Sequence, residues 1–150
     1  MPQSLSKVYL HAVFSTKFRK ELIDPGIENE LYAYMAKILR ECDSPSLIIN
    51  GTRNHIHILF AQSRKVTICK IIEDVKKSSS KWIKIKGPEY RDFYWQGGYG
   101  IFSVGWSSLE IVRKYIANQK QHHQQRSFEN EYIQLLTKYN VEYDERYVWD

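Results

Sequence analysis

The sequence predicts an α+β fold in which helices pack on a single antiparallel sheet. Two observations predict this class. Segments in which polar and apolar residues alternate, as in strands, are interleaved with segments whose apolar residues recur at helical spacing. The chain has 150 residues, of which 43% are hydrophobic and 26% charged, and this is an ordinary globular composition. Because no linker or repeat divides it, we expect residues 1–150 to form a single domain.

The first half of the chain contains three predicted strands and one predicted helix. Residues 5–16 carry apolar side chains at alternate positions and therefore indicate a strand. Asp24 and Pro25 are typical of a helix start, with Asp as the cap and Pro at the first helical position. Residues 46–51 and 55–61 then predict two strands joined by a short turn.

The second half adds a helix, a strand and two further helices. Thr67 is expected to cap the first of these helices, and residues 93–105 indicate a long strand interrupted by glycines. A capping box at 107–110 predicts a helix that runs to about Gln121, and Ser127 is expected to cap the last helix. The first six elements follow the order of a ferredoxin-like, RRM-like split βαβ fold.

The charge distribution favours a nucleic-acid partner. The net charge is +5, and residues 63–126 alone hold 13 basic and 5 acidic residues. No apolar run reaches membrane-spanning length and the N-terminus lacks a secretory signal, so we expect a cytoplasmic protein without a membrane partner. In that reducing compartment, Cys42 and Cys69 are expected to remain unpaired.

The segment His55-Ile56-His57 is a candidate metal site. Side chains alternate along a strand, so His55 and His57 point to the same face while Ile56 points to the other. Two imidazoles placed in this way can converge on one metal ion. The alternative is a pair of half-exposed histidines that bind nothing.

Tyr115 and Gln119 form a second candidate pair. They are four residues apart, so they lie on one face of the predicted helix, at the edge of its apolar stripe. The Gln119 amide oxygen could join His55 and His57 as a neutral ligand and leave positions open for phosphate oxygens and water. Such a site would suit Mg²⁺ or Mn²⁺. The alternative is that Tyr115 is a core residue with an exposed hydroxyl.

This combination resembles a known family. A His-hydrophobic-His segment at 55–57, followed by Tyr115 and Gln119 on a late helix, is similar to the single-tyrosine HUH transposases of the IS200/IS605 family, including the REP-associated tyrosine transposases. The resemblance covers nearly the whole chain and extends to residues 13–17, 76–82, 95–104 and 141–147. Many relatives carry Asp before the first histidine, whereas this chain carries Asn54, which could alter the tuning of His55.

The resemblance implies a mechanism and a substrate. Tyr115 on the C-terminal helices would attack a phosphate of single-stranded DNA that carries hairpins, giving a 5′-phosphotyrosine, with the metal held by His55, His57 and Gln119. Family members often act as homodimers, and no nucleotide cofactor is expected. Candidate phosphate contacts are basic residues of the second half: Lys77, Lys81, Arg113, Lys114, Lys120 and Arg126.

Three other interpretations remain open from the sequence. The chain could be a non-catalytic DNA- or RNA-binding module on the same fold. It could be a different metal hydrolase that uses water as the nucleophile, with Tyr115 only structural. It could also be a domesticated relative that processes chromosomal hairpins by the same chemistry without moving an element.

Overall fold

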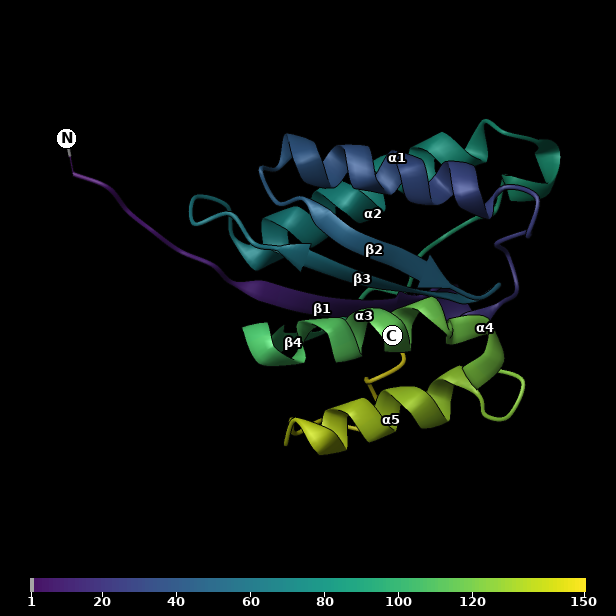
Figure 1. Cartoon of the computed structure of the whole chain (residues 1–150). Helices are drawn as coiled ribbons and strands as arrows, with labels where there is room; N and C mark the ends of the chain where they lie inside the picture. The colour runs from purple at the N-terminus through teal and green to yellow at the C-terminus, as the bar shows by residue number, and fades with distance from the viewer. Residues whose placement is uncertain (1) are drawn as a thin grey trace.

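The computed structural model describes residues 2–150 and contains a four-stranded antiparallel sheet with helices on both faces (Figure 1). The sheet order is β2-β3-β1-β4, so the two central strands are β1 and β3. The strands are β1 (Tyr9–Ser15), β2 (Ser46–Gly51), β3 (His55–Ala61) and β4 (Gly100–Val104). The main helices are α1 (Glu28–Glu41), α2 (Ile68–Lys84), α3 (Leu109–Ala117), α4 (Gln119–His122) and α5 (Phe128–Lys138). The predicted α+β class is confirmed, and the first four strands and two helices follow one another along the chain in the predicted order.

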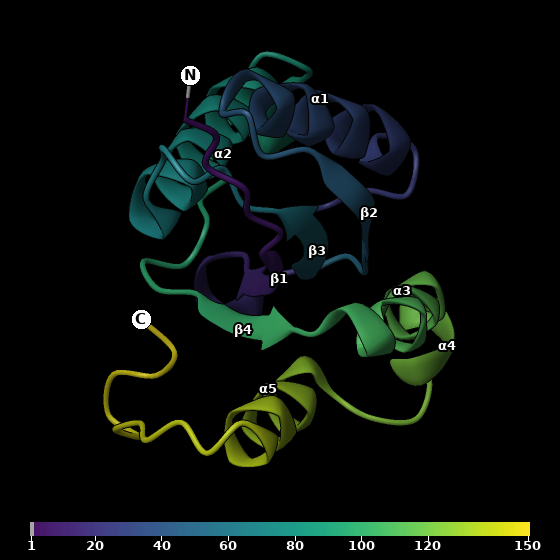
Figure 2. The ribbon, with the colours of Figure 1, turned by 60° about the vertical axis from the view of Figure 1, so that its left-hand side comes forward.

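The sheet separates two layers of helices, with α1 and α2 on one face and α3, α4 and α5 on the other (Figure 2). Alternate residues of a strand face opposite layers. In β1, Leu10, Ala12 and Phe14 therefore pack in the cluster formed with α1 and α2. Val13 instead packs against α5, in a separate cluster with Phe102. The two central strands are thus buried on both faces, and polar groups on the second face are covered by α3–α5.

Two of the predicted helix caps form and fix the helices that flank the sheet. The Thr67 side chain accepts a hydrogen bond from the Lys70 backbone N–H at the start of α2. The Ser127 side chain accepts one from the Asn130 backbone N–H at the start of α5. Gly51 closes β2 where a Cβ atom would overlap the His55 carbonyl oxygen, so the tight turn into β3 requires glycine here.

Several predicted boundaries are wrong. The first helix begins at Glu28, because the Asp24 side chain accepts a hydrogen bond from the Gly26 N–H and so stabilises a turn instead. The expected capping box at 107–110 does not form, and a 3₁₀ turn at Trp106–Ser108 leads into α3 without a side-chain cap.

The predicted strand at 93–105 is also shorter than expected. Only Gly100–Val104 is paired, and Trp95 makes an isolated bridge to Thr16. The first strand likewise starts at Tyr9 rather than at residue 5. The helix predicted to run to Gln121 is divided at Asn118 into α3 and α4. Within residues 2–150, none of the helices has both the length and the apolar character needed to span a membrane.

Candidate functional site

His55 and His57 lie on β3 and face the layer formed by α3–α5, as the alternation predicts. Both side chains are fully buried, so the alternative of half-exposed histidines does not apply. Their strand neighbours in β1 are Ser15 and Val13, respectively. Two polar rings at 0% exposure need partners for their ring nitrogens, and these partners define the site.

The outer nitrogen of each imidazole is held by the surrounding chain. His55 Nδ1 lies 2.8 Å from Asn54 Oδ1 and 2.9 Å from Thr52 Oγ1. His57 Nδ1 lies 2.8 Å from Nε2 of His11, a buried residue of β1. In both rings Nε2 is therefore the nitrogen directed into the site. Outer contacts of this kind fix the tautomer and the orientation of metal-binding histidines.

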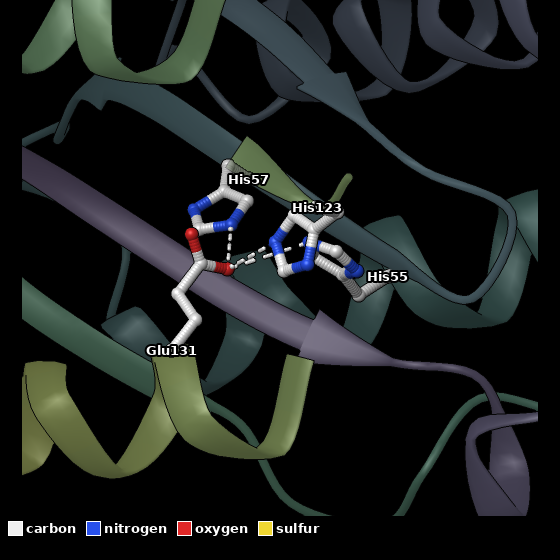
Figure 3. A group of neighbouring side chains, drawn as sticks. All are labelled: His55, His57, His123 and Glu131. Carbon is white, nitrogen blue, oxygen red and sulfur yellow. Dashed lines mark hydrogen bonds and ion pairs between the residues drawn. The ribbon is translucent and has the colours of Figure 1, made fainter. Parts of the chain in front are cut away.

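Two further residues meet these imidazoles, and sequence reasoning did not identify either of them as part of the site. Glu131 extends from α5 so that its Oε1 atom lies 2.9 Å from His57 Nε2, 3.0 Å from His123 Nε2 and 3.4 Å from His55 Nε2 (Figure 3). One ligand atom from each of the four residues lies within 4.8 Å of all the others. The Glu131 carboxylate is fully buried.

The donors of this cluster fit a metal cation. A neutral imidazole has a single N–H. His123 Nδ1 lies 2.9 Å from the Arg126 carbonyl oxygen, and His55 Nδ1 lies 2.8 Å from Asn54 Oδ1, so the single N–H of each neutral ring can be placed on Nδ1. Burial lowers the pKa of His55 to about 4, so this ring is neutral at pH 7.

The inner Nε2 atoms of His55 and His123 then present lone pairs to a carboxylate oxygen at 3.4 and 3.0 Å. The carboxylate oxygen can accept a hydrogen bond from a protonated Nε2 atom, and an unprotonated Nε2 atom can instead join this oxygen in binding a cation. His55, His57, His123 and Glu131 could therefore hold a divalent metal.

Tyr115 and Gln119 join the same cluster, although the chain breaks between α3 and α4. Gln119 is fully buried, with its Oε1 3.1 Å from His55 Nε2 and its Nε2 donating to Glu131 Oε2 at 3.1 Å. The Tyr115 hydroxyl donates to the same Oε2 atom, and Arg126 Nη2 donates to the hydroxyl at 3.0 Å. The pair predicted from helical spacing thus meets the histidine pair within one chain.

The Tyr115 hydroxyl is a neutral phenol in this arrangement. Burial, the negative charge of Glu131 and the hydrogen bond to Glu131 raise the pKa of Tyr115 well above its ordinary value. The Arg126 guanidinium acts in the opposite direction because it favours the phenolate.

The predicted DNA contacts are distributed over three surfaces. Lys120 and Arg126 line a cleft of about 690 Å³ that also contains Asn54 and His123, at the edge of the cluster. Arg113 and Lys114 lie on the exposed side of α3, where Arg113 pairs with Glu110 at 3.7 Å. Lys77 and Lys81 are exposed on α2, which covers the opposite face of the sheet. Of these six residues, Arg126 donates a hydrogen bond to the Tyr115 hydroxyl.

The four-residue cluster, which could hold a metal ion, contacts Tyr115 on the second face of the antiparallel sheet. Residues 4–119 match the family described as "Transposase IS200 like", and the chain belongs to this family of DNA-cutting and DNA-transferring enzymes. A search of curated proteins finds no match.

Solved transposase structures share the fold. A crystal structure from Deinococcus radiodurans R1, of a protein assigned as a transposase, aligns with a TM-score of 0.61 at 17% identity, covering 79% of this chain and 98% of that one. A REP-associated tyrosine transposase bound to a REP hairpin aligns with a TM-score of 0.59 at 13% identity, covering 82% of this chain and 74% of that one. At such identities the likeness shows the fold alone.

Proposed function

We propose that this transposase cleaves and rejoins single-stranded DNA through a covalent intermediate on Tyr115, assisted by a divalent metal at His55 and His57. The observation that supports this most is the position of the Tyr115 hydroxyl. It shares the Glu131 carboxylate with both histidines inside one buried cluster. Packing of a tyrosine that is only structural does not require several imidazole nitrogens beside its hydroxyl.

The proposed step exchanges one phosphodiester for another. The Tyr115 oxygen forms a bond to phosphorus, and the bond from phosphorus to the 3′ oxygen of the preceding nucleotide breaks. The phenol proton passes along the existing hydrogen bond to Glu131 Oε2, and the 3′ oxygen takes a proton from water and leaves as a hydroxyl. Because the 5′-phosphotyrosine retains the ester bond, a second DNA 3′ hydroxyl can attack it and join a new partner.

The residues around Tyr115 support attack by a phenol whose pKa is raised. Arg126 donates to the hydroxyl and stabilises negative charge as it develops on the oxygen. Gln119, through Glu131, holds the hydroxyl close to the histidines. When bound, the divalent cation would polarise the phosphate oxygens as a Lewis acid.

The proposed substrate is a single strand that carries a hairpin. Support comes from the cleft beside the cluster, where Arg19, Arg53, Lys120 and Arg126 contribute basic groups. Three acidic residues line the same cleft and pair with these basic groups: Glu28 with Lys120 at 3.1 Å, Glu21 with Arg53 at 3.9 Å and Glu129 with Arg19 at 4.0 Å. A phosphate would have to exchange with these carboxylates. The fold neighbour that was solved with a REP hairpin makes a hairpin ligand a reasonable first choice.

We propose that the site acts within one chain, whether or not the protein is a homodimer. Tyr115, Gln119 and both histidines of the same chain are already in contact. A mixture of Tyr115→Phe and His57→Ala proteins should therefore not recover activity. Recovery in the mixture would mean that the site is shared between subunits.

The test of the proposed function is a covalent adduct. The full chain is incubated with Mn²⁺ and a labelled single strand from the DNA flanking its gene, including the hairpin, and is resolved on a denaturing gel. We expect an adduct that disappears in Tyr115→Phe and in His57→Ala but persists in Tyr143→Phe, which alters an exposed tyrosine. An undiminished adduct in Tyr115→Phe would rule out the nucleophile.

The same experiment separates the other interpretations. A non-catalytic module would bind the strand without forming an adduct, and a hydrolase that uses water would cut it without one. A domesticated relative would give the same adduct, because its chemistry is the same.

A further inference from the structure

We infer that Glu131 of α5 and His123, which directly follows α4, complete the metal site as its anionic ligand and as a third imidazole ligand. This inference rests on the proposed function only in that it concerns the same metal. Both residues lie beyond residue 119, where the match to the family ends, so the match does not account for them. Their position in the fold and their contacts carry the inference.

The distances from Glu131 to the three imidazoles match the spacing of ligands around one ion, and all four ligand atoms lie within 4.8 Å of one another. Metal bonds to imidazole nitrogen and carboxylate oxygen are about 2.1 Å long. Neighbouring ligands of one ion are then about 3.0 Å apart in an octahedral site and about 3.4 Å apart in a tetrahedral one. Glu131 Oε1 lies 2.9, 3.0 and 3.4 Å from the Nε2 atoms of His57, His123 and His55.

Packing of α5 on the sheet places Glu131 beside the histidines. Phe128 is 2% exposed, and its ring stacks on His55 with centroids 4.6 Å apart. Tyr132 and Leu136 bury the next turns of the helix in the cluster with Val13 of β1. Because this face of the helix is fixed on the sheet, Glu131 is directed at the histidines.

The second carboxylate oxygen connects the metal site to the nucleophile. Oε2 accepts hydrogen bonds from the Tyr115 hydroxyl and from Gln119 Nε2, while Oε1 faces the imidazoles. Glu131 would therefore bind the cation through one oxygen and orient Tyr115 through the other. Gln119 becomes a positioning residue that holds Glu131 through its donation to Oε2.

This ligand set alters the expected metal. Three imidazoles and one carboxylate favour Mn²⁺, Zn²⁺ and related transition metals, whereas Mg²⁺ prefers oxygen ligands. We therefore expect the full chain to bind Mn²⁺ at micromolar or lower concentration and to bind Mg²⁺ at least tenfold more weakly.

The competing explanation is that Glu131 only fills the metal position when no ion is present. The two explanations predict opposite changes in metal affinity when the Glu131 carboxylate is removed. If Glu131 is a ligand, its removal weakens metal binding. If Glu131 occupies the position of the ion and has to move aside, its removal strengthens metal binding.

The test is isothermal titration of the metal-free full chain with MnCl₂ in the absence of DNA. We expect at least tenfold weaker binding in Glu131→Gln and in His123→Ala, and a change of less than twofold in Glu129→Gln, which alters the neighbouring acid in the first turn of the same helix. Equal or tighter binding by Glu131→Gln, or no Mn²⁺ binding by the unmodified chain, would overturn the inference.

A second variant and the adduct assay complement the titration. Glu131→Asp retains the charge but withdraws the carboxylate by one methylene, so it should also weaken Mn²⁺ binding. This variant takes the place of Glu131→Gln if Glu131→Gln does not fold. The adduct assay with the unmodified chain is read separately. An adduct that forms while Glu131→Gln binds Mn²⁺ normally would refute the inference but leave the proposed function intact.

Discussion

The contacts behind His55 give a prediction whose magnitude follows from the structure. Asn54 Oδ1 and Thr52 Oγ1 lie 2.8 and 2.9 Å from His55 Nδ1, and the Thr52 hydroxyl also donates to Asn54 Oδ1 at 3.1 Å. Removal of such an outer contact typically weakens metal binding about 10- to 100-fold. Because either partner alone can still accept the Nδ1–H, each single substitution should weaken metal binding by about tenfold, the lower end of this range.

We therefore expect Asn54→Ala and Thr52→Val each to weaken Mn²⁺ binding about tenfold, which is about 1.4 kcal/mol. The double variant should lose about 100-fold or more, since no nearby acceptor then holds the ring. Asn54→Asp, which restores the residue of many relatives, should bind as tightly as the unmodified chain or more tightly. Isothermal titration with MnCl₂ measures all four affinities.

The reasoning would be refuted if the double variant bound Mn²⁺ as tightly as the unmodified chain while remaining folded by circular dichroism. Such a result would mean that His55 does not depend on its outer nitrogen for orientation, or that it is not a ligand.

Three further predictions concern the binding of a DNA strand in the cleft, the cap of α5 and the buried lysine of α2. Phe18 lines the cleft beside the site with a left-handed φ of 57° and 65% exposure. Phe18→Ala should therefore weaken binding of a labelled oligothymidylate about tenfold in fluorescence anisotropy, whereas Trp106→Ala, at the remote end of the sheet, should not. Ser127→Ala should cost about 1 kcal/mol in urea unfolding because it removes a cap, while Ser107→Ala, whose expected cap does not form, should change little. Burial lowers the pKa of Lys76 to about 8, so between pH 8 and about 10.5 the unfolded chain binds more protons, and the free energy of unfolding should rise relative to Lys76→Met. A flat difference across that window would contradict this prediction.

The parts of the fold that follow from local patterns could be predicted from the sequence. Alternation identified β3 and the common face of His55 and His57, because side-chain direction in a strand depends only on residue parity. Helical spacing likewise brought Tyr115 and Gln119 to one face, and this relation survives the break at Asn118 because α4 continues in nearly the same direction (Figure 1).

The remainder of the site depends on tertiary packing that no local pattern encodes. Glu131 in the first turn of α5 is also what the helix dipole favours, so its sequence position alone suggests a solvent-exposed acid. Its burial follows from the docking of Phe128 and Tyr132 on β1. His11 carried a usable signal, since it lies at the same strand parity as Val13, which pairs with His57 in the adjacent strand. His123 had none, because the segment around it has no apolar period.

The predicted starts of two helices were wrong for a related reason. Asp24 and Ser107 are good caps in isolation, but Asp24 stabilises a tight turn here and Ser107 lies within a 3₁₀ segment. Whether a cap is used depends on where the preceding chain leaves the sheet.

The most direct measurement of the central claim is the location of the DNA–protein bond. The full chain is incubated with Mn²⁺ and its hairpin-bearing single strand, the DNA is trimmed with nuclease, and the protein is digested for peptide mass spectrometry. We predict that the peptide containing Tyr115 carries a residual nucleotide through a 5′ phosphate and that the released strand ends in a 3′ hydroxyl. A nucleotide on any other residue, or cleavage with an unmodified Tyr115 peptide, would contradict the account.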